Sequence, residues 1–356
     1  MRTLIRPTGF VDSPFGHDGK VARLAGGMTW FAAVELIRVE GQKRVSAELL
    51  PVEGLESRFD DEMRAQWEAL TSARRPMRLA ERTIRLDQPQ VMGIINATPD
   101  SFSDGGQFRD AAAAAEAGAN MAAKGAAIID VGGESTRPGA RSIWEGDEIE
   151  RIVPVIRQLV SGGAAVSVDT RKADVMTAAV AAGARMINDV SALTYDQRSA
   201  ETAAAAKVPI VLMHHQGAPE VMQEDPRYDD VLVEVYLWLE ERISTAVDAG
   251  IRRELNLIDP GFGFGKNVAH NLELMNGLAL FHSLGCPMVL GASRKRTIGA
   301  LSNEAPVDRR LAGSIAFALK AVEQGAQILR VHDVPETLQA LRIWRGLRDQ
   351  ALTPRV

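Results

Sequence analysis

Short apolar runs alternate with longer amphipathic stretches from residue 91 to near the end of the chain. The runs are rich in β-forming residues and the stretches between them are rich in Ala and Leu, a pattern that predicts strand–helix units and a parallel sheet. Eight such runs occur, at residues 91–95, 127–131, 165–169, 185–189, 209–213, 255–259, 287–291 and 327–331. The pattern therefore predicts eight strands in order along the chain.

A helix is predicted after each strand, and glycines mark the ends of several of these helices. The clearest helical stretches are 110–124, 172–182, 231–249, 272–284 and 335–348. Gly stands just past helix ends, where a left-handed backbone favours it, at Gly125, Gly183, Gly250, Gly285 and Gly325. Eight units in about 260 residues match a (β/α)8 TIM barrel. The competing fold is an open doubly wound sheet, which usually has fewer strands and a glycine-rich turn after the first one.

Residues 1–82 have a different pattern of apolar and polar segments from the rest of the chain. Short apolar segments lie at 21–24, 30–39 and 44–50, and one polar helical stretch covers 60–73. We expect a small α+β N-terminal extension over 1–82, followed by the barrel over 83–356. Packing or oligomerisation is the simplest role for this extension, and a second binding site is the alternative. The segment 82–90 is expected to form a short hairpin or strand that closes the floor of the barrel.

Composition narrows the class of protein without changing the predicted fold. Of the 356 residues, 46% are hydrophobic and 24% are charged, as in an ordinary globular chain. The formal net charge is −5, and neither half is basic enough to predict binding to nucleic acid or to an anionic membrane. The single cysteine, Cys286, excludes a disulfide framework and a cysteine-rich zinc site. Because no apolar run suits a membrane span or a signal peptide, the cytoplasm is the expected compartment.

Polar side chains follow almost every predicted strand at its C-terminal end. In barrel enzymes the reacting groups lie at these strand ends and on the loops that follow them. Because so many polar side chains converge on one mouth of the barrel, a binding or catalytic site is predicted there. The residues are Asn96, Asp169, Asn188, Asp189, His214, His215, Asp259, Ser293, Arg294, Lys295, Arg330 and His332.

The acidic and amide side chains of this set suit a flat heterocyclic ligand. Asp169, Asn188 and Asp259 offer acceptors and one amide deep in the predicted barrel. A heterocycle with an amidine-like edge can donate two parallel hydrogen bonds to one carboxylate. Burying such groups without partners is costly, which favours a polar ligand over an empty site.

The basic side chains suit an anion. They are predicted to form a rim for a phosphate or diphosphate group, made by Arg137, Arg330, His332 and Asn96. Asp100 and Asp104 are candidates for holding Mg2+ together with that group. The reason is that Mg2+ typically takes one or two carboxylates in addition to phosphate oxygens.

Three other kinds of site fit the spacing less well. The run 261–266 resembles a phosphate-binding loop, but Asn267 follows its lysine where a nucleotide loop needs Ser or Thr. His214 and His215 are adjacent, so on a strand they face opposite sides and are poorly placed to share a metal ion. Lys295 is a candidate Schiff-base lysine, although the arginines on either side of it favour simple binding of an anion.

Seven motifs, in order along the chain, resemble those of the dihydropteroate synthase family. They are MGIINATPDSFSDGG, IIDVGGESTRPGA, VDT, IND, DPGFGFGK, GASRK and RVHD, and the similarity covers residues 83–350. The family is a (β/α)8 barrel, usually a homodimer, and a target of sulfonamides. It joins p-aminobenzoate to 6-hydroxymethyl-7,8-dihydropterin diphosphate with loss of diphosphate, in folate biosynthesis. The resemblance therefore implies a transferase with two small-molecule substrates and with Mg2+ as its cofactor.

The resemblance also implies a role for each site residue. The pterin lies against Asp169, Asn188, Asp259 and Lys295. The diphosphate and its Mg2+ are held by Asn96, Arg137, Arg330 and His332, with Asn96 as the metal ligand. The p-aminobenzoate sits over Thr136, Pro138, Phe264 and Ser293. The implied catalytic residues are Asp104, Arg137 and Lys295, with Asp104 near the cation that forms as diphosphate leaves.

The chain departs from the family pattern at two places. His215 stands where the family often has the second Met of Met-His-Met-Gln-Gly, and residues 1–82 have no counterpart in the minimal family barrel.

Two alternatives share the pterin cradle: a non-catalytic pterin-binding homologue, and an enzyme that transfers a methyl group from a methylated folate. The ESTRPGA loop and the SRK segment argue against methyl transfer. The retained Arg137, Arg330 and His332 argue against a non-catalytic homologue.

Overall fold

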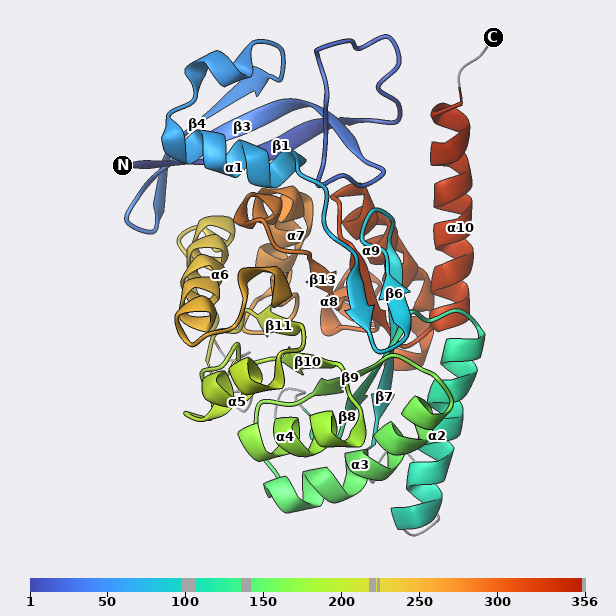
Figure 1. Ribbon diagram of the computed structural model, residues 1–356. Coiled ribbons are helices and arrows are strands. Elements are labelled where there is room, and N and C mark those ends of the chain that lie inside the picture. Colours follow the sequence, from blue (N-terminus) through green and yellow to red (C-terminus); the bar gives the residue numbers. More distant parts are fainter. Residues whose placement is uncertain (98–106, 136–141, 218–221, 223–224, 354–356) are drawn as a thin grey trace.

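Eight parallel strands form the barrel that the sequence predicts (Figure 1). The structure is a computed structural model and describes residues 1–97, 107–135, 142–217, 222 and 225–353. The barrel strands are β7 (Gln90–Asn96), β8 (Ile128–Gly132), β9 (Val166–Asp169), β10 (Met186–Asp189), β11 (Ile210–Met213), β12 (Asn256–Asp259), β13 (Val289–Leu290) and β14 (Ile328–Val331). Strands β7 to β12 pair in chain order, and β14 pairs with both β13 and β7. A bridge between Ile258 and Met288 joins the last edge, so the ring of strands closes.

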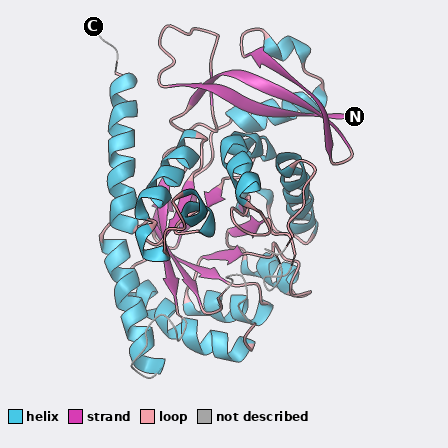
Figure 2. Cartoon of the chain, turned by 180° about the vertical axis from the view of Figure 1, so that it is seen from behind, coloured by secondary structure: helices cyan, strands magenta, loops and turns pink. Residues whose placement is uncertain are grey.

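Helices surround this ring, as the cartoon seen from behind shows (Figure 2). They are α2 (Gln107–Ala123), α3 (Glu145–Ser161), α4 (Ala173–Ala182), α5 (Ser199–Ala206), α6 (Val231–Asp248), α7 (Val268–Gly277), α8 (Arg296–Leu301), α9 (Leu311–Glu323) and α10 (Val334–Ala351). Gly183 ends α4 with a backbone φ of 113°, the left-handed conformation expected there. None of the described helices is long and apolar enough to cross a bilayer.

The helix predicted over 272–284 is divided in the structure. Only α7 is α-helical, and the chain continues as a 3-10 helix, η4 (Leu278–Leu284). The change occurs at Gly277, where an added Cβ would lie 2.5 Å from the side-chain methyls of Leu232 on α6. Glycine fits this close approach but favours an α-helix less than other residues do, which accounts for the break.

A short hairpin closes the floor of the barrel, as expected for the segment before the first barrel strand. Its strands are β5 (Met77–Leu79) and β6 (Arg82–Ile84), so it begins earlier than residue 82. It contributes to one apolar cluster at the N-terminal ends of the barrel strands, made of Met77, Leu79, Ile84, Leu86, Met92, Ile128, Ala165, Met186, Val211, Leu257, Val289 and Ile328. This cluster, here called the floor cluster, seals one end of the barrel against water.

The N-terminal region is an antiparallel sheet with one helix, which confirms an α+β extension. Its elements are β1 (Arg2–Val11), β2 (Ala22–Arg23), β3 (Trp30–Glu40), β4 (Lys43–Pro51), the 3-10 helix η1 (Leu55–Arg58) and α1 (Asp61–Thr71). The central strand β3 pairs with all three other strands. Its Phe31 and Val34 are buried with Leu70 of α1 and with Ala279 of η4. The sheet therefore packs directly against the barrel layer (Figure 1).

The first strand of this sheet has no counterpart among the predicted segments. β1 contains Pro7, and a proline inside an apolar run normally argues against a strand. The structure resolves the conflict because β1 pairs only with β3 and is an edge strand. At an edge, a residue without an N–H group need not interrupt the hydrogen-bonded ladder.

The floor cluster yields a stability prediction. Leu79 is fully buried in it, so Leu79→Ala is expected to lower the free energy of unfolding by about 2–5 kcal/mol. Equilibrium urea denaturation measures the change. The matched control is Leu347→Ala on α10, where the leucine is 69% exposed and little change is expected. Equal effects of the two substitutions would show that the hairpin does not seal the barrel.

Candidate active site

Five polar side chains point into the barrel just above the floor cluster. They lie two or four residues after floor-cluster residues on the same strands, and strand side chains alternate between faces, so both sets face inward. The five are Asp130 (β8), Asp169 (β9), Asn188 (β10), Asp259 (β12) and Arg330 (β14). The structure thus brings together three of the four predicted pterin residues, Asp169, Asn188 and Asp259, with Arg330, and it adds Asp130.

Arg330 is the centre of this polar layer. Its Nε donates to Asp130 Oδ2 at 2.6 Å, and its Nη2 donates to Asp169 Oδ2 at 2.5 Å. Asn188 Nδ2 donates to the same Asp130 oxygen at 2.9 Å. The guanidinium that the sequence analysis assigned to a diphosphate rim therefore also lies against carboxylates of the predicted pterin cradle.

Asp130 is a site residue that the sequence analysis missed. It is fully buried, and within the described part of the chain its Oδ1 has no hydrogen-bond partner. A buried carboxylate oxygen without a partner is costly and indicates a ligand that donates to it. The sequence does contain an indication of this role, because Asp130 is the single acid inside the apolar run AIIDV. It also lies on the same strand face as Ile128 of the floor cluster.

Burial dominates the electrostatics of the carboxylates. It raises the pKa of Asp169 to about 7, although the attraction of Arg330 acts in the opposite direction. Burial also raises the pKa of Asp259, whose Oδ1 accepts a hydrogen bond from Gly261 N at 2.8 Å. Both groups are poorly solvated as anions, so a ligand that supplies N–H donors stabilises them.

Lys295 follows β13, between the strands that carry Asp259 and Arg330, and directly precedes α8. Its Nζ donates to the carbonyl of Phe262 and stands 4.2 Å from the centre of the Phe264 ring. Burial lowers the pKa of Lys295 to about 7, and the nearby Asp259 opposes this shift. A Cβ at Gly263, whose φ is +82°, would lie 2.8 Å from Lys295 Cδ, so the close approach requires glycine.

The glycine-rich loop after β12 is held by a buried lysine. Lys266 Nζ lies 2.8 Å from His214 Nδ1 and donates to the carbonyls of Gly261 and Phe264 at 3.0 and 3.1 Å. Burial lowers the pKa values of both Lys266 and His214 well below their usual range. Lys266 thus acts on the site indirectly, because it fixes the loop that carries Phe264.

His215, which departs from the family pattern, takes no part in the contact between Lys266 and His214. Its Nδ1 is 3.2 Å from the carbonyl of Gly217, and its Nε2 is 3.4 Å from Thr194 Oγ1. Its ring meets the ring of Trp238 edge-on, with 5.8 Å between centres. The two adjacent histidines therefore have different polar partners, and both pack on Trp238.

The remaining described residues lie around the mouth. Ser293 Oγ is 3.0 Å from His332 Nδ1, so a residue predicted for p-aminobenzoate contacts one predicted for diphosphate. Asn96 ends β7, and its backbone pairs with Gly132 at the end of β8. The predicted residues Asp100, Asp104, Thr136, Arg137 and Pro138 lie outside the described residues.

A second missed cluster ties together the chain on either side of residues 136–141. Glu134 accepts hydrogen bonds from the backbone N of Ile143 at 3.0 Å and from Lys172 Nζ at 3.1 Å. Lys172 also donates to Glu148 at 2.8 Å and to the carbonyl of Ile143 at 2.7 Å. Arg171 completes the cluster with a 3.0 Å bond to Glu134. Residues 134 and 143 are thereby fixed next to each other.

The fold and the site define a (β/α)8 barrel with buried acids paired to an arginine at the C-terminal ends of its strands. The model of the family described as Pterin binding enzyme matches residues 92–332. Dihydropteroate synthase of Escherichia coli (strain K12) is 47% identical over 262 residues, which are 73% of this chain and 92% of that protein. The chain belongs to the dihydropteroate synthase family.

Solved structures agree with this assignment. Xanthomonas albilineans dihydropteroate synthase with 4-aminobenzoic acid superposes with a TM-score of 0.73 at 47% identity, covering 78% of this chain and 99% of that one. Dihydropteroate synthase from the same organism in complex with 7,8-dihydropteroate gives a TM-score of 0.71 at 44% identity, with 78% and 100% covered. Because these proteins are covered almost end to end and the family match begins at residue 92, most of the N-terminal extension is absent from them.

The ion pair at the centre of the site yields a second stability prediction. Asp130→Ala leaves one side of the Arg330 guanidinium unpaired inside the barrel, which is expected to cost about 3 kcal/mol of unfolding free energy. Equilibrium denaturation checks it. The matched control is Asp174→Ala, which removes an exposed pair with Arg198 and is expected to cost less than about 1 kcal/mol. A loss no larger than that of the control would contradict the central role of Asp130.

Proposed function

We propose that this protein condenses 6-hydroxymethyl-7,8-dihydropterin diphosphate with p-aminobenzoate to give 7,8-dihydropteroate and diphosphate, in folate biosynthesis. The observation that carries the proposal is the buried layer of Asp130, Asp169, Asn188 and Asp259 beside Arg330. Family membership supports it, since a related structure is a complex with 7,8-dihydropteroate.

The pterin is proposed to bind against Asp169, Asn188, Asp259 and Lys295. The pterin ring carries an amidine-like edge whose N–H groups match the buried carboxylates, and the amide of Asn188 can both donate and accept. Asp130 deepens this cradle, because its second oxygen has no partner among the described residues. Lys295 supplies a donor for the ring oxygen.

The diphosphate is proposed to lie at Asn96, Arg137, Arg330 and His332. The amide of Asn96 is proposed to hold Mg2+ together with diphosphate oxygens. The amide oxygen of Asn96 and the diphosphate oxygens suit Mg2+, because this ion prefers oxygen ligands and usually keeps phosphates and waters around it. Among the described residues no group of three or more His, Cys, Asp or Glu could hold a metal ion by itself. When bound, Mg2+ neutralises charge on the leaving diphosphate.

The p-aminobenzoate is proposed to lie over Thr136, Pro138, Phe264 and Ser293. Phe264 supplies an apolar surface, and the loop that carries it is held from below by Lys266. The hydroxyl of Ser293 contacts His332, so the second substrate would lie beside the leaving group. That arrangement favours reaction only when both substrates are present.

The proposed chemistry needs no covalent enzyme intermediate. The bond between the pterin methylene carbon and the diphosphate oxygen breaks, and its electron pair leaves with the diphosphate. The amine nitrogen of p-aminobenzoate then donates its lone pair to that carbon, and the nitrogen loses a proton to solvent. Arg137 and Arg330 stabilise the negative charge of the departing diphosphate, and Asp104 stabilises the developing cation. Lys295 holds the pterin ring in the reactive orientation.

Four broader proposals accompany the reaction. Residues 83–356 are proposed as the catalytic unit, with residues 1–82 as an extension that packs on it. The protein is proposed to form a homodimer and to work in the cytoplasm, and light scattering of the purified protein tests the first of these two. Its family also makes it a candidate target of sulfonamides, since the Yersinia pestis relative has been solved in a sulfonamide complex.

The reaction itself is tested with both substrates and Mg2+. Diphosphate release is expected to require p-aminobenzoate and to yield a product with the mass of 7,8-dihydropteroate. Chelation with EDTA is expected to slow release by about tenfold or more, and added Mg2+ should restore it. Pterin binding without any product would instead support a non-catalytic homologue or an enzyme that transfers a methyl group.

Asp169→Asn tests the pterin cradle. The substitution keeps the size of the side chain but removes a charge-assisted acceptor, so pterin affinity is expected to fall about 10- to 100-fold. Calorimetry with 7,8-dihydropterin measures it, and circular dichroism checks that the barrel is folded. The control is Asp174→Asn, an exposed aspartate on α4. Unchanged affinity in the Asp169 variant would show that the cradle is misassigned.

A further inference from the structure

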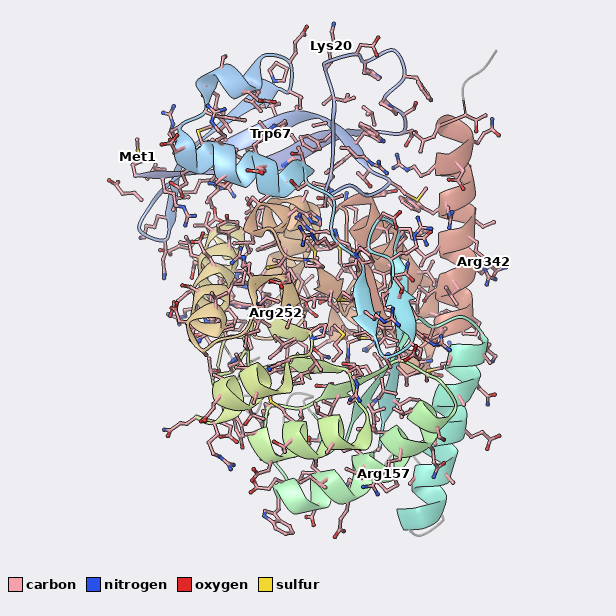
Figure 3. The ribbon with its side chains drawn as sticks, in the orientation of Figure 1. Met1, Lys20, Trp67, Arg157, Arg252 and Arg342 are labelled. Atoms are coloured by element: carbon pink, nitrogen blue, oxygen red, sulfur yellow. The ribbon has the colours of Figure 1, made fainter. Side chains whose placement is uncertain are left out.

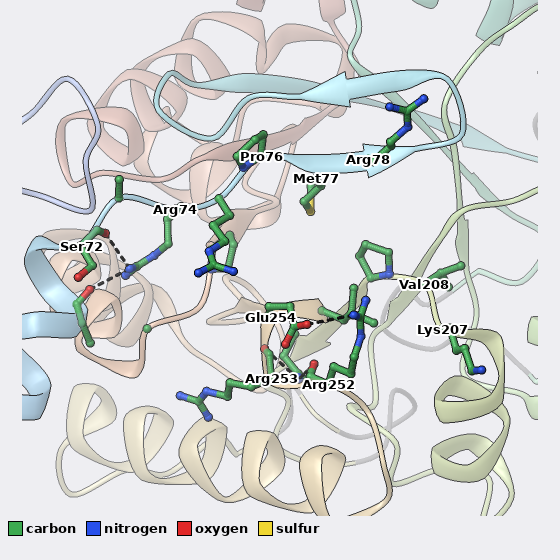
Figure 4. A pocket seen from close by; sticks show the side chains of 18 of the residues that line it. Ser72, Arg74, Pro76, Met77, Arg78, Lys207, Val208, Arg252, Arg253 and Glu254 are labelled. Atoms are coloured by element: carbon green, nitrogen blue, oxygen red, sulfur yellow. Dashed lines mark hydrogen bonds and ion pairs between the residues drawn. The ribbon is translucent and has the colours of Figure 1, made fainter.

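A cavity of about 840 Å³ lies at the opposite end of the barrel from the active site. One wall is the chain that leads from α1 into β5, and the other is formed by residues at the N-terminal ends of β10 to β13. Figure 4 shows it framed by Arg74, Pro76 and Arg78 on one side and by Arg252, Arg253 and Glu254 on the other. A volume of this size accommodates a small organic ligand.

The lining of this cavity is strongly basic. Seven of its residues are Arg or Lys and only two are Glu, in a chain whose formal net charge is −5. The concentration of positive charge is therefore local and does not follow from composition. Arg252 forms an exposed ion pair with Glu254 at 3.2 Å, and Arg78 forms one with Glu81 at 3.4 Å. These pairs neutralise two of the seven cations only weakly.

Two of the cations that line the cavity have no partner of their own among the described residues. Within the described residues, Arg75 and Lys207 make no hydrogen bond or ion pair, and both are exposed. Arg74, by contrast, is buried and bonded to the carbonyls of Ala69 and His282 at 2.8 Å, so it belongs to the structure of the wall. Like charges gathered without counter-charges destabilise a fold unless an anion binds them.

We propose that this cavity binds a small molecule that carries two or more phosphate groups. Guanidinium groups match phosphate oxygens in pairs, and several of them on two walls can contact more than one phosphate. Apolar lining from Met77, Val208 and Pro209 offers surface for an organic body attached to the phosphates.

The site is separate from the proposed reaction. The floor cluster fills the barrel between this cavity and the polar layer around Arg330, and Met77 belongs to both the cluster and the cavity lining. One wall comes from the N-terminal extension, most of which lies outside the match to the related synthases. The cavity is therefore a feature of this chain and needs no catalytic activity to be tested.

Isothermal titration of the full-length protein with inorganic tripolyphosphate, without Mg2+, tests the proposal. Saturable binding is expected for the unmodified protein, with inorganic monophosphate at least about tenfold weaker because it engages fewer cations. The double variant Arg75→Glu/Lys207→Glu is expected to bind tripolyphosphate about tenfold or more weakly, since two attractive charges become repulsive. Both residues are exposed, and neither side chain makes a hydrogen bond or ion pair with the described residues, so the fold should be unaffected.

The matched control changes the same amount of charge elsewhere. Arg157→Glu/Arg342→Glu alters exposed arginines on α3 and α10, away from Arg252 at the cavity (Figure 3), and is expected to leave affinity unchanged. An equal loss in this control would show nonspecific attraction and overturn the proposal. So would binding that persists in the Arg75/Lys207 variant but disappears in His332→Ala, because that result locates the anion at the barrel mouth. Equal affinities for monophosphate and tripolyphosphate would overturn the requirement for several phosphates.

Discussion

The contact of Arg330 with Asp130 and Asp169 is the interaction on which the geometry of the site depends. It joins β14 to β8 and β9 across the inside of a closed ring of strands. Removing three charges from water costs several kcal/mol per ion, and the cost is offset only if the partners are held at hydrogen-bond distance. A slip of one residue in strand register would turn either acid toward the helix layer and leave Arg330 unpaired. The buried charges therefore require the same strand register that forms the site.

The apolar floor cluster makes this arrangement possible. It lies one inward-facing position below the polar layer on most strands, so water is kept from the barrel floor. Low polarity around the acids raises the pKa of Asp169 and of Asp259, and it strengthens any hydrogen bond that a ligand makes to them. The hairpin that completes the floor belongs to the chain before the barrel, so the sealed end depends on residues outside the strand–helix repeat.

Two buried lysines fix the loops around the mouth. Lys266 holds the loop that carries Phe264, and Lys172 holds Glu134 and Ile143 on either side of residues 136–141. Backbone carbonyls accept from both lysines, so their positions depend on the course of the chain more than on a single ion pair. Lysine suits this role because one ammonium group can donate to three acceptors at once. The site thus contains residues that shape it without reaching a substrate.

The sequence by itself determined the eight strands, their order and most of the residues at the barrel mouth. Strand periodicity and the direction of a parallel strand depend on neighbours along the chain, so Asp169, Asn188, Asp259 and Arg330 could be assigned to one end of the barrel. Only the tertiary structure decided which of them touch: Arg330 reaches the acids of β8 and β9, more than 160 residues away in the chain. Asp130 and Lys172 were missed, and the role of Lys266 in holding its loop was not predicted. A charged residue beside an apolar run gives no indication of which groups will pair with it in the fold. The edge strand β1 and the basic cavity beneath the floor likewise depend on how the extension packs, which is set by contacts between segments and not by the pattern within either one.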